Sequence, residues 1–438
     1  MSFREYLSQL DRADQLCRVS VPVSKEYEAA GVIKALEPKA VLFSAIRESR
    51  FQVAGGLFTG KAQLARYFGI QQNQLIPALA HAISSPSQPA RVDDAPCQHT
   101  VNLNPDLDEL PILRHCQQDG GNYISSGVVV TSHPDWGQNL DFHRFMQISK
   151  TEMAVRVVRS RHFDAFLKDQ RQIPAAICVG VPPAVLIAGA TSVDIGVDEL
   201  TIANTLSPLQ VVKAKTVDLW VPADCEFIIE GFVDGERLHP EGPFVDLTGT
   251  YDIVRDQPVF TVTAITHRED AIWHGLLPGG LEHKLLMGMP REPTIFAKVN
   301  EVVDCLDVHI TPGGASWLHA VVQIRKHAPD DGKKAIEAAF AGHRSCKHVF
   351  VVDEDIDIYD PHQVEWAMAT RFQGDRDMLV KPPEQGSSLD PSADLQTHFT
   401  TKIGFDLTAP LGAAAAGFQK APFPAVQLEK YLTHQAKS

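Results

Sequence analysis

The chain has 438 residues, of which 44% are hydrophobic and 21% are charged, and its formal net charge is -14. A chain of this length exceeds the size at which a single hydrophobic core keeps growing, so we predict a globular protein of two or three domains. The negative charge excludes nucleic acid or an anionic membrane surface as the main partner, although a local basic site can still recognise a small anion.

Neither a secretory leader nor a membrane span is expected. The segment Met1–Glu5 lacks the apolar stretch of a signal peptide. The longest apolar run, residues 174–190, is interrupted by Gly180 and by Pro182-Pro183, so it predicts a buried strand and a turn. The seven cysteines are scattered, odd in number and without a C-x-x-C pair, which predicts reduced thiols in a cytoplasmic protein.

Residues 1–100 predict a small N-terminal α/β region. The segment Ser2–Glu5 matches a capping box that opens a helix, and residues 41–43 and 51–56 are typical of strands that enter turns. Residues 55–62 follow the spacing of a phosphate-binding loop, but Ala62 stands where a serine or threonine would hold magnesium. We therefore predict a hairpin turn there in preference to an ATP site.

Residues 101–300 and 301–438 predict two further domains. The middle region has few helical patterns and is rich in β-type runs, at residues 128–131, 153–158, 227–229 and 259–266. This pattern predicts a central antiparallel sheet, barrel-like or open. In the last region a helical pattern at 333–340, a buried strand at 348–352 and a helix capped by Asp360-Pro361 predict a C-terminal α/β domain. The whole chain is thus expected to be a multidomain protein of mixed α/β and α+β class.

The segment His239–Gly249 holds two carboxylates, Glu241 and Asp246, in a turn rich in proline and glycine. Prolines restrict the backbone and glycines permit tight turns, so the loop is expected to have a fixed shape that can hold a proton donor in place. The alternative is a surface turn with two solvated carboxylates.

A second group of polar residues occupies positions 139–146. Asn139, Asp141 and His143 stand at alternate positions, which share one face in a strand. The alternative is a solvated edge strand. Arg144 is the best candidate to bind a carboxylate, because its planar guanidinium can contact both oxygens at once.

Three further side chains form a possible ligand set for a divalent cation. The amide of Asn139, the imidazole of His162 and the carboxylate of Glu199 suit manganese or magnesium better than a thiolate-preferring metal. A lone histidine or glutamate is ordinarily a surface or satisfied core residue, and the sequence alone does not bring the three together.

In their order along the chain, these motifs resemble the UbiD-type decarboxylases, which use prenylated flavin mononucleotide (prFMN). The resemblance covers nearly the whole chain. It rests on Glu-Gly-Pro-Phe-x-Asp-x-Thr-Gly-x-Tyr at 241–251, on Asn139 followed by Arg144 and His162, and on Asp198-Glu199-Leu200 before Val221-Pro222-Ala223. It implies a reversible non-oxidative decarboxylation, a split-barrel-like central domain that holds the cofactor, and a flavin prenyltransferase as the supplier of that cofactor.

The resemblance also implies roles for individual residues. A Mn²⁺ or Mg²⁺ ion that anchors the cofactor phosphate would bind Asn139, His162 and Glu199, and relatives bind K⁺ largely through backbone carbonyls. The implied catalytic network is Arg144, Glu241 and Asp246. The implied cofactor contacts are Phe142, His143, Arg144, Arg156, Val157, Val158 and His162. Position 246 is Glu in the branch that acts on acrylic acids and Asp in the ubiquinone branch, which disfavours an acrylic substrate.

Residues 274–284 and 289–291 are similar to the 2,5-furandicarboxylate decarboxylases of this family. In that branch a His and an Arg at the positions of His283 and Arg291 read a second carboxylate. The alternative is a helix with solvated basic residues.

The expected reaction is therefore the decarboxylation of an aromatic or heteroaromatic acid, with furan-2,5-dicarboxylate as the first candidate. A polyprenyl-hydroxybenzoate or another unsaturated acid is the alternative substrate within the family. A flavin-dependent oxidoreductase on a similar β scaffold and a non-enzymatic binding protein are the alternatives outside it. We expect a homodimer or homohexamer that associates through the C-terminal domain, residues 301–438.

Overall fold

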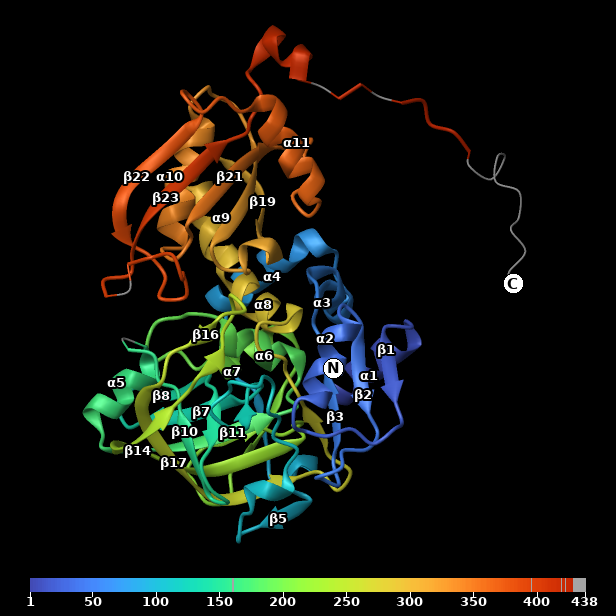
Figure 1. Cartoon of the computed structure of the whole chain (residues 1–438), viewed down its shortest axis with the longest axis vertical. Coiled ribbons are helices and arrows are strands. Elements are labelled where there is room, and N and C mark those ends of the chain that lie inside the picture. Colours follow the sequence, from blue (N-terminus) through green and yellow to red (C-terminus); the bar gives the residue numbers. More distant parts are fainter. Residues whose placement is uncertain (160, 395, 419, 422, 428–438) are drawn as a thin grey trace.

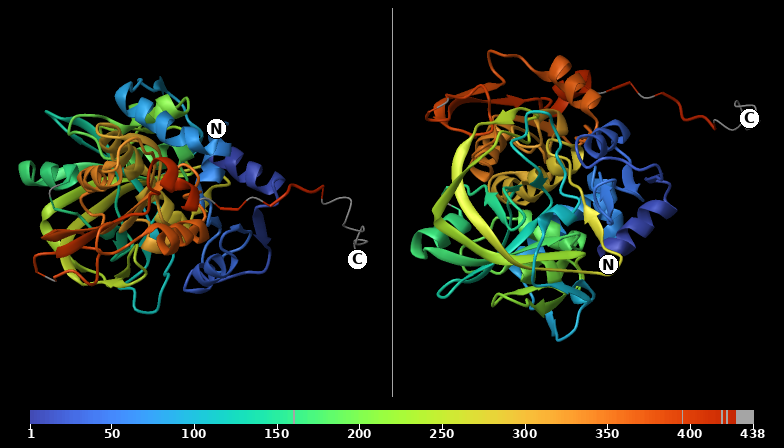
Figure 2. Two further views of the ribbon diagram at one scale, coloured as in Figure 1. Left: turned by 90° about the horizontal axis from the view of Figure 1, so that it is seen from above. Right: turned by 60° about the horizontal axis from the view of Figure 1, so that its bottom comes forward.

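The computed structural model describes residues 1–159, 161–394, 396–418, 420–421 and 423–427. It contains three domains in the order expected from the sequence. The C-terminal domain occupies one end of the long axis, the central domain occupies the other, and the N-terminal domain lies beside the central one (Figure 1). In the views of Figure 2 the orange C-terminal domain lies over the central domain, with the blue N-terminal domain at its side.

The N-terminal domain is a small α/β unit, as predicted. Its first helix begins with the expected capping box, in which the Ser2 hydroxyl accepts the Glu5 N–H at 3.1 Å and the Glu5 carboxylate accepts the Ser2 N–H at 2.6 Å. Its elements are α1 (Phe3–Arg12), β1 (Leu16–Val19), α2 (Glu28–Leu36), β2 (Ala40–Phe43), β3 (Gln52–Gly55), α3 (Lys61–Phe68), η1 (Gln72–Gln74) and α4 (Leu75–Ser84). The strands form a sheet of order β1-β2-β3-β18, completed by β18 (Ile272–His274) from later in the chain.

The hairpin predicted at residues 55–62 is wrong. The chain leaves β3 at Gly55, and Lys61 begins helix α3 with Gly60 as its N-cap. Lys61 is only 5% exposed and its ammonium lies 2.7 Å from Glu292. This pairing joins residues far apart in the chain, so the local turn pattern could not reveal it.

The central domain is built on a nine-stranded sheet of order β6-β9-β10-β17-β14-β11-β7-β8, with β5 beside β17, and every pair of strands in it is antiparallel, as predicted. The strands of the whole central domain, in chain order, are β4 (Ala90–Val92), β5 (Thr100–Asn102), β6 (Tyr123–Ile124), β7 (Val128–His133), β8 (Gly137–Phe142), β9 (Phe145–Gln147), β10 (Glu152–Val155), β11 (Gln172–Val179), β12 (Gln210–Lys213), β13 (Trp220–Pro222), β14 (Phe227–Glu241), β15 (Phe244–Val245), β16 (Tyr251–Asp252) and β17 (Arg255–His267). Its helices are η2 (Pro96–Gln98), η3 (Leu107–Glu109), α5 (His162–Asp169), α6 (Pro183–Ala190) and α7 (Glu199–Leu206).

The apolar run at residues 174–190 forms most of strand β11 and then helix α6. The predicted buried strand is confirmed, but the predicted turn is wrong because residues 183–190 form a helix. Residues 183–189 of α6 are all buried. A helix that is apolar on every side has no amphipathic period, and its sequence cannot be distinguished from a buried strand and turn by pattern alone. None of the helices in the described ranges combines the length and apolar character needed to cross a membrane.

The long pair β14 and β17 carries the polar loop of the sequence to one end of the sheet. Register shifts interrupt the pairing near Gly231 and between Asp234 and Leu238, and the last pair of the ladder is Glu241 with Arg255. The segment between them contains the short hairpin β15–β16. Such irregularities bend a strand and re-aim its side chains, which is how Glu241 reaches the interior.

The C-terminal domain confirms the predicted helices and strand. It contains α8 (Leu281–Gly288), η4 (Met289–Arg291), α9 (Glu292–Asn300), β19 (Asp304–Ile310), η5 (Pro312–Gly314), β20 (His319–Arg325), α10 (Asp331–Gly342), β21 (His348–Asp353), α11 (Pro361–Arg371), β22 (Met378–Gln385), β23 (Phe399–Asp406) and η6 (Gly412–Phe418). Its sheet has the order β19-β20-β21-β23-β22. The apolar core of the N-terminal domain is continuous with that of the central domain, whereas the C-terminal core is separate and reached by Ile76 of α4.

Candidate active site

Arg144 lies at the centre of a buried cluster of carboxylates. It stands between β8 and β9, and its side chain is 11% exposed. Its Nε and Nη2 donate to the two oxygens of Glu241 at 2.8 and 3.1 Å, its Nη1 donates to Asp246 at 3.4 Å, and its Nη2 also reaches Asp252 at 3.0 Å. The Glu241 side chain is 0% exposed, so it is not the solvated carboxylate of a surface turn.

Aromatic side chains close one side of this cluster. The Tyr123 hydroxyl donates to Glu241 at 3.1 Å, and burial raises the pKa of Tyr123, so the hydroxyl remains a donor. The Tyr123 and Phe244 rings lie 4.4 Å apart, and the Arg144 guanidinium carbon lies 4.7 Å from the Phe244 ring centre. A cation over an aromatic face in an apolar setting is held more strongly than in water.

Close contacts and hydrogen bonds constrain the loop that carries the carboxylates. Gly242 has φ +104°, and a Cβ there would lie 3.0 Å from the Ile253 carbonyl oxygen. Asp246 accepts the Leu247 N–H at 2.6 Å, and its own N–H donates to Thr250 at 2.9 Å. Backbone hydrogen bonds on both sides therefore orient the Asp246 carboxylate.

His283, on α8, lies within electrostatic range of this cluster. Its Nδ1 accepts the Gly279 N–H at 3.0 Å, so the neutral ring carries its proton on Nε2 and can donate there. Burial lowers the pKa of His283, Arg144 lowers it further, and Asp246 opposes the shift. A neutral donor thus lies within electrostatic range of both Asp246 and Arg144.

The residues expected to bind a metal are brought together. His162, the first residue of α5, contacts the Asn139 amide oxygen through Nδ1 at 2.7 Å. Glu199, the first residue of α7, accepts the N–H of Leu140 at 2.7 Å and is 2% exposed. Burial raises the pKa of Glu199 well above its usual range, and neighbouring Asp141 raises it further.

The amide oxygen, imidazole nitrogen and carboxylate of these three residues are ligand types that a divalent cation accepts. The Asn139 Nδ2, which is a donor, is buried without a hydrogen-bond partner in the described part of the chain, so the polar contacts of this cluster are incomplete there. A buried carboxylate beside a second carboxylate is stabilised by a cation. No group of three His, Cys, Asp or Glu side chains within the described residues is arranged to hold a metal, and the set here has an amide as its third member.

The expected cofactor contacts lie around β8 and the end of β10. The His143 Nδ1 contacts the Arg156 carbonyl oxygen at 2.9 Å, and its Nε2 lies 3.0 Å from Asp141. Burial lowers the pKa of His143, but Asp141 outweighs it and the net shift is upward. The Val157 N–H donates to Gln257 at 2.7 Å, Val158 is exposed, and Phe142 ends β8.

Arg291 belongs to a second cluster, made of cations. It is the last residue of η4, and its guanidinium and that of Arg161 both donate to the Ser192 hydroxyl. Burial lowers the pKa of Arg291 to about 10, and the charge of Arg161 contributes to this shift. Its guanidinium carbon also lies 5.5 Å from the Trp317 ring centre. Arg291 is thus partly buried, in contrast to the fully solvated basic residue of the alternative interpretation, and two guanidinium groups face one hydroxyl.

Four residues of these clusters were not predicted from the sequence: Tyr123, Arg161, Ser192 and Asp252. Asp252 directly follows Tyr251, which ends the motif that begins at Glu241, so a motif longer by one position would include it. Tyr123, Arg161 and Ser192 stand in no motif, and only their hydrogen bonds reveal them.

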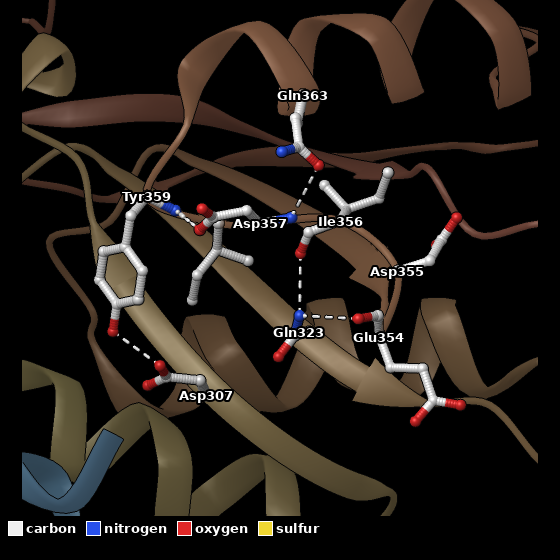
Figure 3. Close-up of a pocket in the computed structure, with 9 residues that line it drawn as sticks. Asp307, Gln323, Glu354, Asp355, Ile356, Asp357, Tyr359 and Gln363 are labelled. Carbon is white, nitrogen blue, oxygen red and sulfur yellow. Dashed lines mark hydrogen bonds between the residues drawn. The ribbon is translucent and has the colours of Figure 1, made fainter. Parts of the chain in front are cut away.

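Two cavities of the described part of the chain lie away from these clusters. One of about 430 Å³ lies in the C-terminal domain and is shown in Figure 3. It is lined by Asp307, Gln323, Glu354, Asp355, Ile356, Asp357, Ile358, Tyr359 and Gln363. Another, of about 210 Å³, lies beside Phe51 and His267. Because neither is lined by Arg144, Glu241 or Asp246, cavity size does not locate the chemistry here.

Comparison with known proteins shows which family the chain resembles. Three family models match consecutive parts of the chain: the 3-octaprenyl-4-hydroxybenzoate carboxy-lyase N-terminal domain at residues 7–83, its Rift-related domain at 89–281 and its C-terminal domain at 284–407. The anhydromevalonate phosphate decarboxylase of Methanothermobacter thermautotrophicus is 40% identical over 425 residues, which are 95% of this chain and 99% of the relative.

Solved structures agree over the whole chain. The UbiD-class enzyme HmfF from Pelotomaculum thermopropionicum, solved in complex with FMN, is 34% identical with a TM-score of 0.96, over 99% of this chain and 100% of that chain. An evolved dimeric form of HmfF in complex with prFMN is 33% identical with a TM-score of 0.91, over 98% and 100% of the two chains. The three family models match the chain in order, and the central domain holds the buried Arg144–Glu241 pair. The chain therefore belongs to the UbiD family and is a decarboxylase, that is, a carboxy-lyase.

Proposed function

We propose that this protein uses prFMN to remove CO₂ from an unsaturated or aromatic acid that carries a second anionic group. The observation that carries the proposal is the buried guanidinium of Arg144, which faces Glu241, Asp246 and Asp252 with the neutral His283 beside them. An arginine in this setting can bind the carboxylate to be lost, and the neighbouring carboxylic acids can return a proton to the carbon.

The two catalytic carboxylates differ in how tightly they are held. Glu241 receives two hydrogen bonds from Arg144 and one from Tyr123, and it is 0% exposed. Asp246 is 20% exposed and its contact with Arg144, at 3.4 Å, is longer. We therefore assign the orientation of Arg144 to Glu241, and the delivery of the proton to Asp246, which can leave Arg144 when a substrate carboxylate arrives.

The residues present fit prFMN and a divalent ion. When bound, prFMN supplies the electron sink for loss of CO₂. Asn139, His162 and Glu199 would hold Mn²⁺ or Mg²⁺ beside its phosphate, since the buried Glu199 next to Asp141 calls for a cation. Phe142, His143, Arg144, Arg156, Val157, Val158 and His162 would contact the cofactor. K⁺ binding through backbone carbonyls is part of the same proposal.

The second anionic group would be read by His283 and Arg291. Arg291 shares the Ser192 hydroxyl with Arg161, and two guanidinium groups suit a doubly charged phosphate better than a single carboxylate. The name of the Methanothermobacter relative points the same way. We therefore place anhydromevalonate phosphate ahead of furan-2,5-dicarboxylate as the substrate to test first, and give this relationship more weight than the expectation that Asp246 disfavours an acrylic acid.

The test is CO₂ release by protein co-expressed with a flavin prenyltransferase and supplied with Mn²⁺. Anhydromevalonate phosphate, furan-2,5-dicarboxylate and a panel of aromatic acids would be compared. We expect CO₂ from an acid with a second anionic group and its loss in Arg144→Ala. Absence of CO₂ from every acid would overturn the proposal, and flavin reduction by a substrate without CO₂ would favour an oxidoreductase.

Self-association is part of the proposal. The C-terminal domain leaves Met378, Val380 and Phe399 exposed on one face of its outer strands β22 and β23, at 42%, 53% and 47%. Apolar side chains exposed on one face of a sheet favour contact with another chain. We propose that this face joins copies of the protein into a homodimer or homohexamer.

A further inference from the structure

Two buried glutamates flank His283 and Arg291 in the sequence. Glu282 directly precedes His283, Glu292 directly follows Arg291, and each glutamate is 1% exposed. We call residues 281–292, which form α8, η4 and the start of α9, the reader segment. A buried carboxylate must be satisfied by partners of fixed geometry, so the two glutamates anchor both ends of this segment.

Both anchors are held by one short piece of the N-terminal domain, residues 57–61. The Leu57 N–H donates to Glu282 at 3.1 Å, and the Lys61 ammonium lies 2.7 Å from Glu292. The remaining carboxylate oxygens are also engaged, by His274 Nε2 at 2.8 Å for Glu282 and by the Ile310 N–H at 2.9 Å for Glu292. This piece is the part of the chain whose spacing resembles a phosphate-binding loop.

Lys61 has no donor left for a nucleotide phosphate. Besides Glu292, its ammonium donates to the Tyr359 hydroxyl at 3.0 Å and to the Val308 carbonyl at 3.2 Å. The Tyr359 hydroxyl in turn donates to Asp307 at 2.6 Å, at the edge of the C-terminal cavity (Figure 3). Burial lowers the pKa of Lys61, but Glu292, Tyr359 and Asp307 together outweigh it, so the net pKa is raised and the lysine stays charged.

A buried ion pair contributes little net folding free energy, because removing two charges from water costs about as much as their attraction returns. Its hydrogen bonds are directional, however, and they specify one geometry where apolar packing would tolerate several. We propose that residues 57–61 position the reader segment, and that Lys61 is a positioning residue that places Arg291 for recognition of the second anionic group. This inference rests on the proposed role of His283 and Arg291.

The experiment compares two acids that differ only in the second anionic group, anhydromevalonate phosphate and anhydromevalonate. Lys61→Met removes the charge, Lys61→Arg retains it, and Arg4→Met is the matched control. Arg4 makes a similar ion pair from α1 to Glu226, which is 1% exposed, and it does not touch the reader segment. We expect Lys61→Met to raise KM for the phosphate about tenfold with kcat within about twofold, and to leave the unphosphorylated acid unchanged.

Calorimetric titration of the phosphate into protein without cofactor gives a readout independent of turnover, and Lys61→Arg should recover part of the affinity. If Lys61→Met does not fold, the double variant Lys61→Met/Glu292→Gln, which removes both charges, takes its place. Equal effects of Lys61→Met on both acids, or none, would overturn the inference while Arg291→Ala still discriminates between them. If the wild type binds both acids equally, the proposed second anionic group fails as well.

Discussion

One guanidinium, that of Arg144, faces three carboxylates in a site from which water is largely excluded. An arriving substrate carboxylate must displace one of them, and the contact with Asp246, at 3.4 Å, is weaker than those with Glu241 and Asp252. Substrate binding would thus release the Asp246 carboxylate, which is 20% exposed and can then take up a proton from solvent and pass it to the carbon that has lost CO₂. The arrangement links recognition of the substrate carboxylate to this proton transfer.

We therefore predict that Asp246→Asn lowers kcat by about 10²–10⁴-fold, the usual contribution of a general acid, while the cofactor still binds. Steady-state CO₂ release measures the first effect, and the flavin absorbance of the purified protein measures the second. Glu241→Gln is the comparison: because Glu241 holds Arg144, this variant should also raise KM. A kcat for Asp246→Asn within about threefold of wild type would show that another group delivers the proton.

A buried histidine near Arg291 makes stability depend on pH. His343 is 6% exposed, its Nε2 contacts the Trp317 carbonyl at 3.0 Å, and burial lowers its pKa to about 4 from 6.5. The unfolded chain binds a proton below pH 6.5 and the folded chain does not. The stabilising contribution is therefore complete above pH 6.5 and is lost as the pH falls toward about 4.

His343→Asn keeps a donor for the carbonyl but cannot titrate. We predict that the unfolding free energy of the wild type falls faster than that of the variant, by about 1.4 kcal/mol per pH unit between these two pKa values. Urea unfolding of both proteins across this range measures the difference. Parallel curves would mean that His343 is protonated in the folded protein as readily as in the unfolded one.

At the scale of elements, the strand pair β14–β17 and its end loop decide where the acids stand. Gly242 follows directly after β14, in a left-handed conformation and close to the Ile253 carbonyl. Gly249, at the other end of the loop, is also left-handed with φ +77°, but a Cβ there would meet nothing within 4 Å. A substitution at Gly249 therefore tests the backbone conformation alone, whereas a substitution at Gly242 tests conformation and crowding together.

We predict that Gly249→Ala costs about 1 kcal/mol of stability, from the positive φ alone, and leaves kcat nearly unchanged. Gly242→Ala adds a contact of 3.0 Å with the Ile253 carbonyl, so it should destabilise more and also lower kcat by displacing Glu241. Thermal unfolding and CO₂ release on the two variants provide the comparison. Identical behaviour of the pair would contradict a crowded loop at Gly242.

At the scale of the whole molecule, the N-terminal and central domains share a core, and the C-terminal domain is attached through α4 and the reader segment. The N-terminal domain shares its core with the central domain, and it contacts the start of the C-terminal domain at Glu282 of α8 and Glu292 of α9. It therefore braces the junction between the central and C-terminal domains.

The outer face of β22 and β23 is predicted to join copies of the chain. Val380→Asp places a charge in that face, which should shift the protein to a smaller assembly. Val302→Asp is the matched control, because Val302 is 51% exposed but lies in the turn after α9, away from this face. Size-exclusion chromatography with light scattering measures both. An unchanged mass for Val380→Asp would move the interface elsewhere.

The family and the elements whose causes lie within a few residues can be predicted from the sequence. The capping box at Ser2–Glu5, the Asp360-Pro361 cap and the β-type runs act through neighbours along the chain, and the structure confirms them. Arg144, Glu241 and Asp246 can be identified as candidate site residues because turn composition and the order of motifs are visible along the chain.

The contacts that those residues make depend on the folded chain and cannot be predicted from local sequence. Tyr123 and Glu241 are 118 positions apart, and Lys61 reaches Glu292 across two domains, so no local pattern records either contact. The segment at residues 55–62 illustrates the difference: its spacing is that of a phosphate loop, yet burial gives its lysine a carboxylate partner. Such pairings arise from packing and desolvation of the whole molecule, which the order of residues alone does not display.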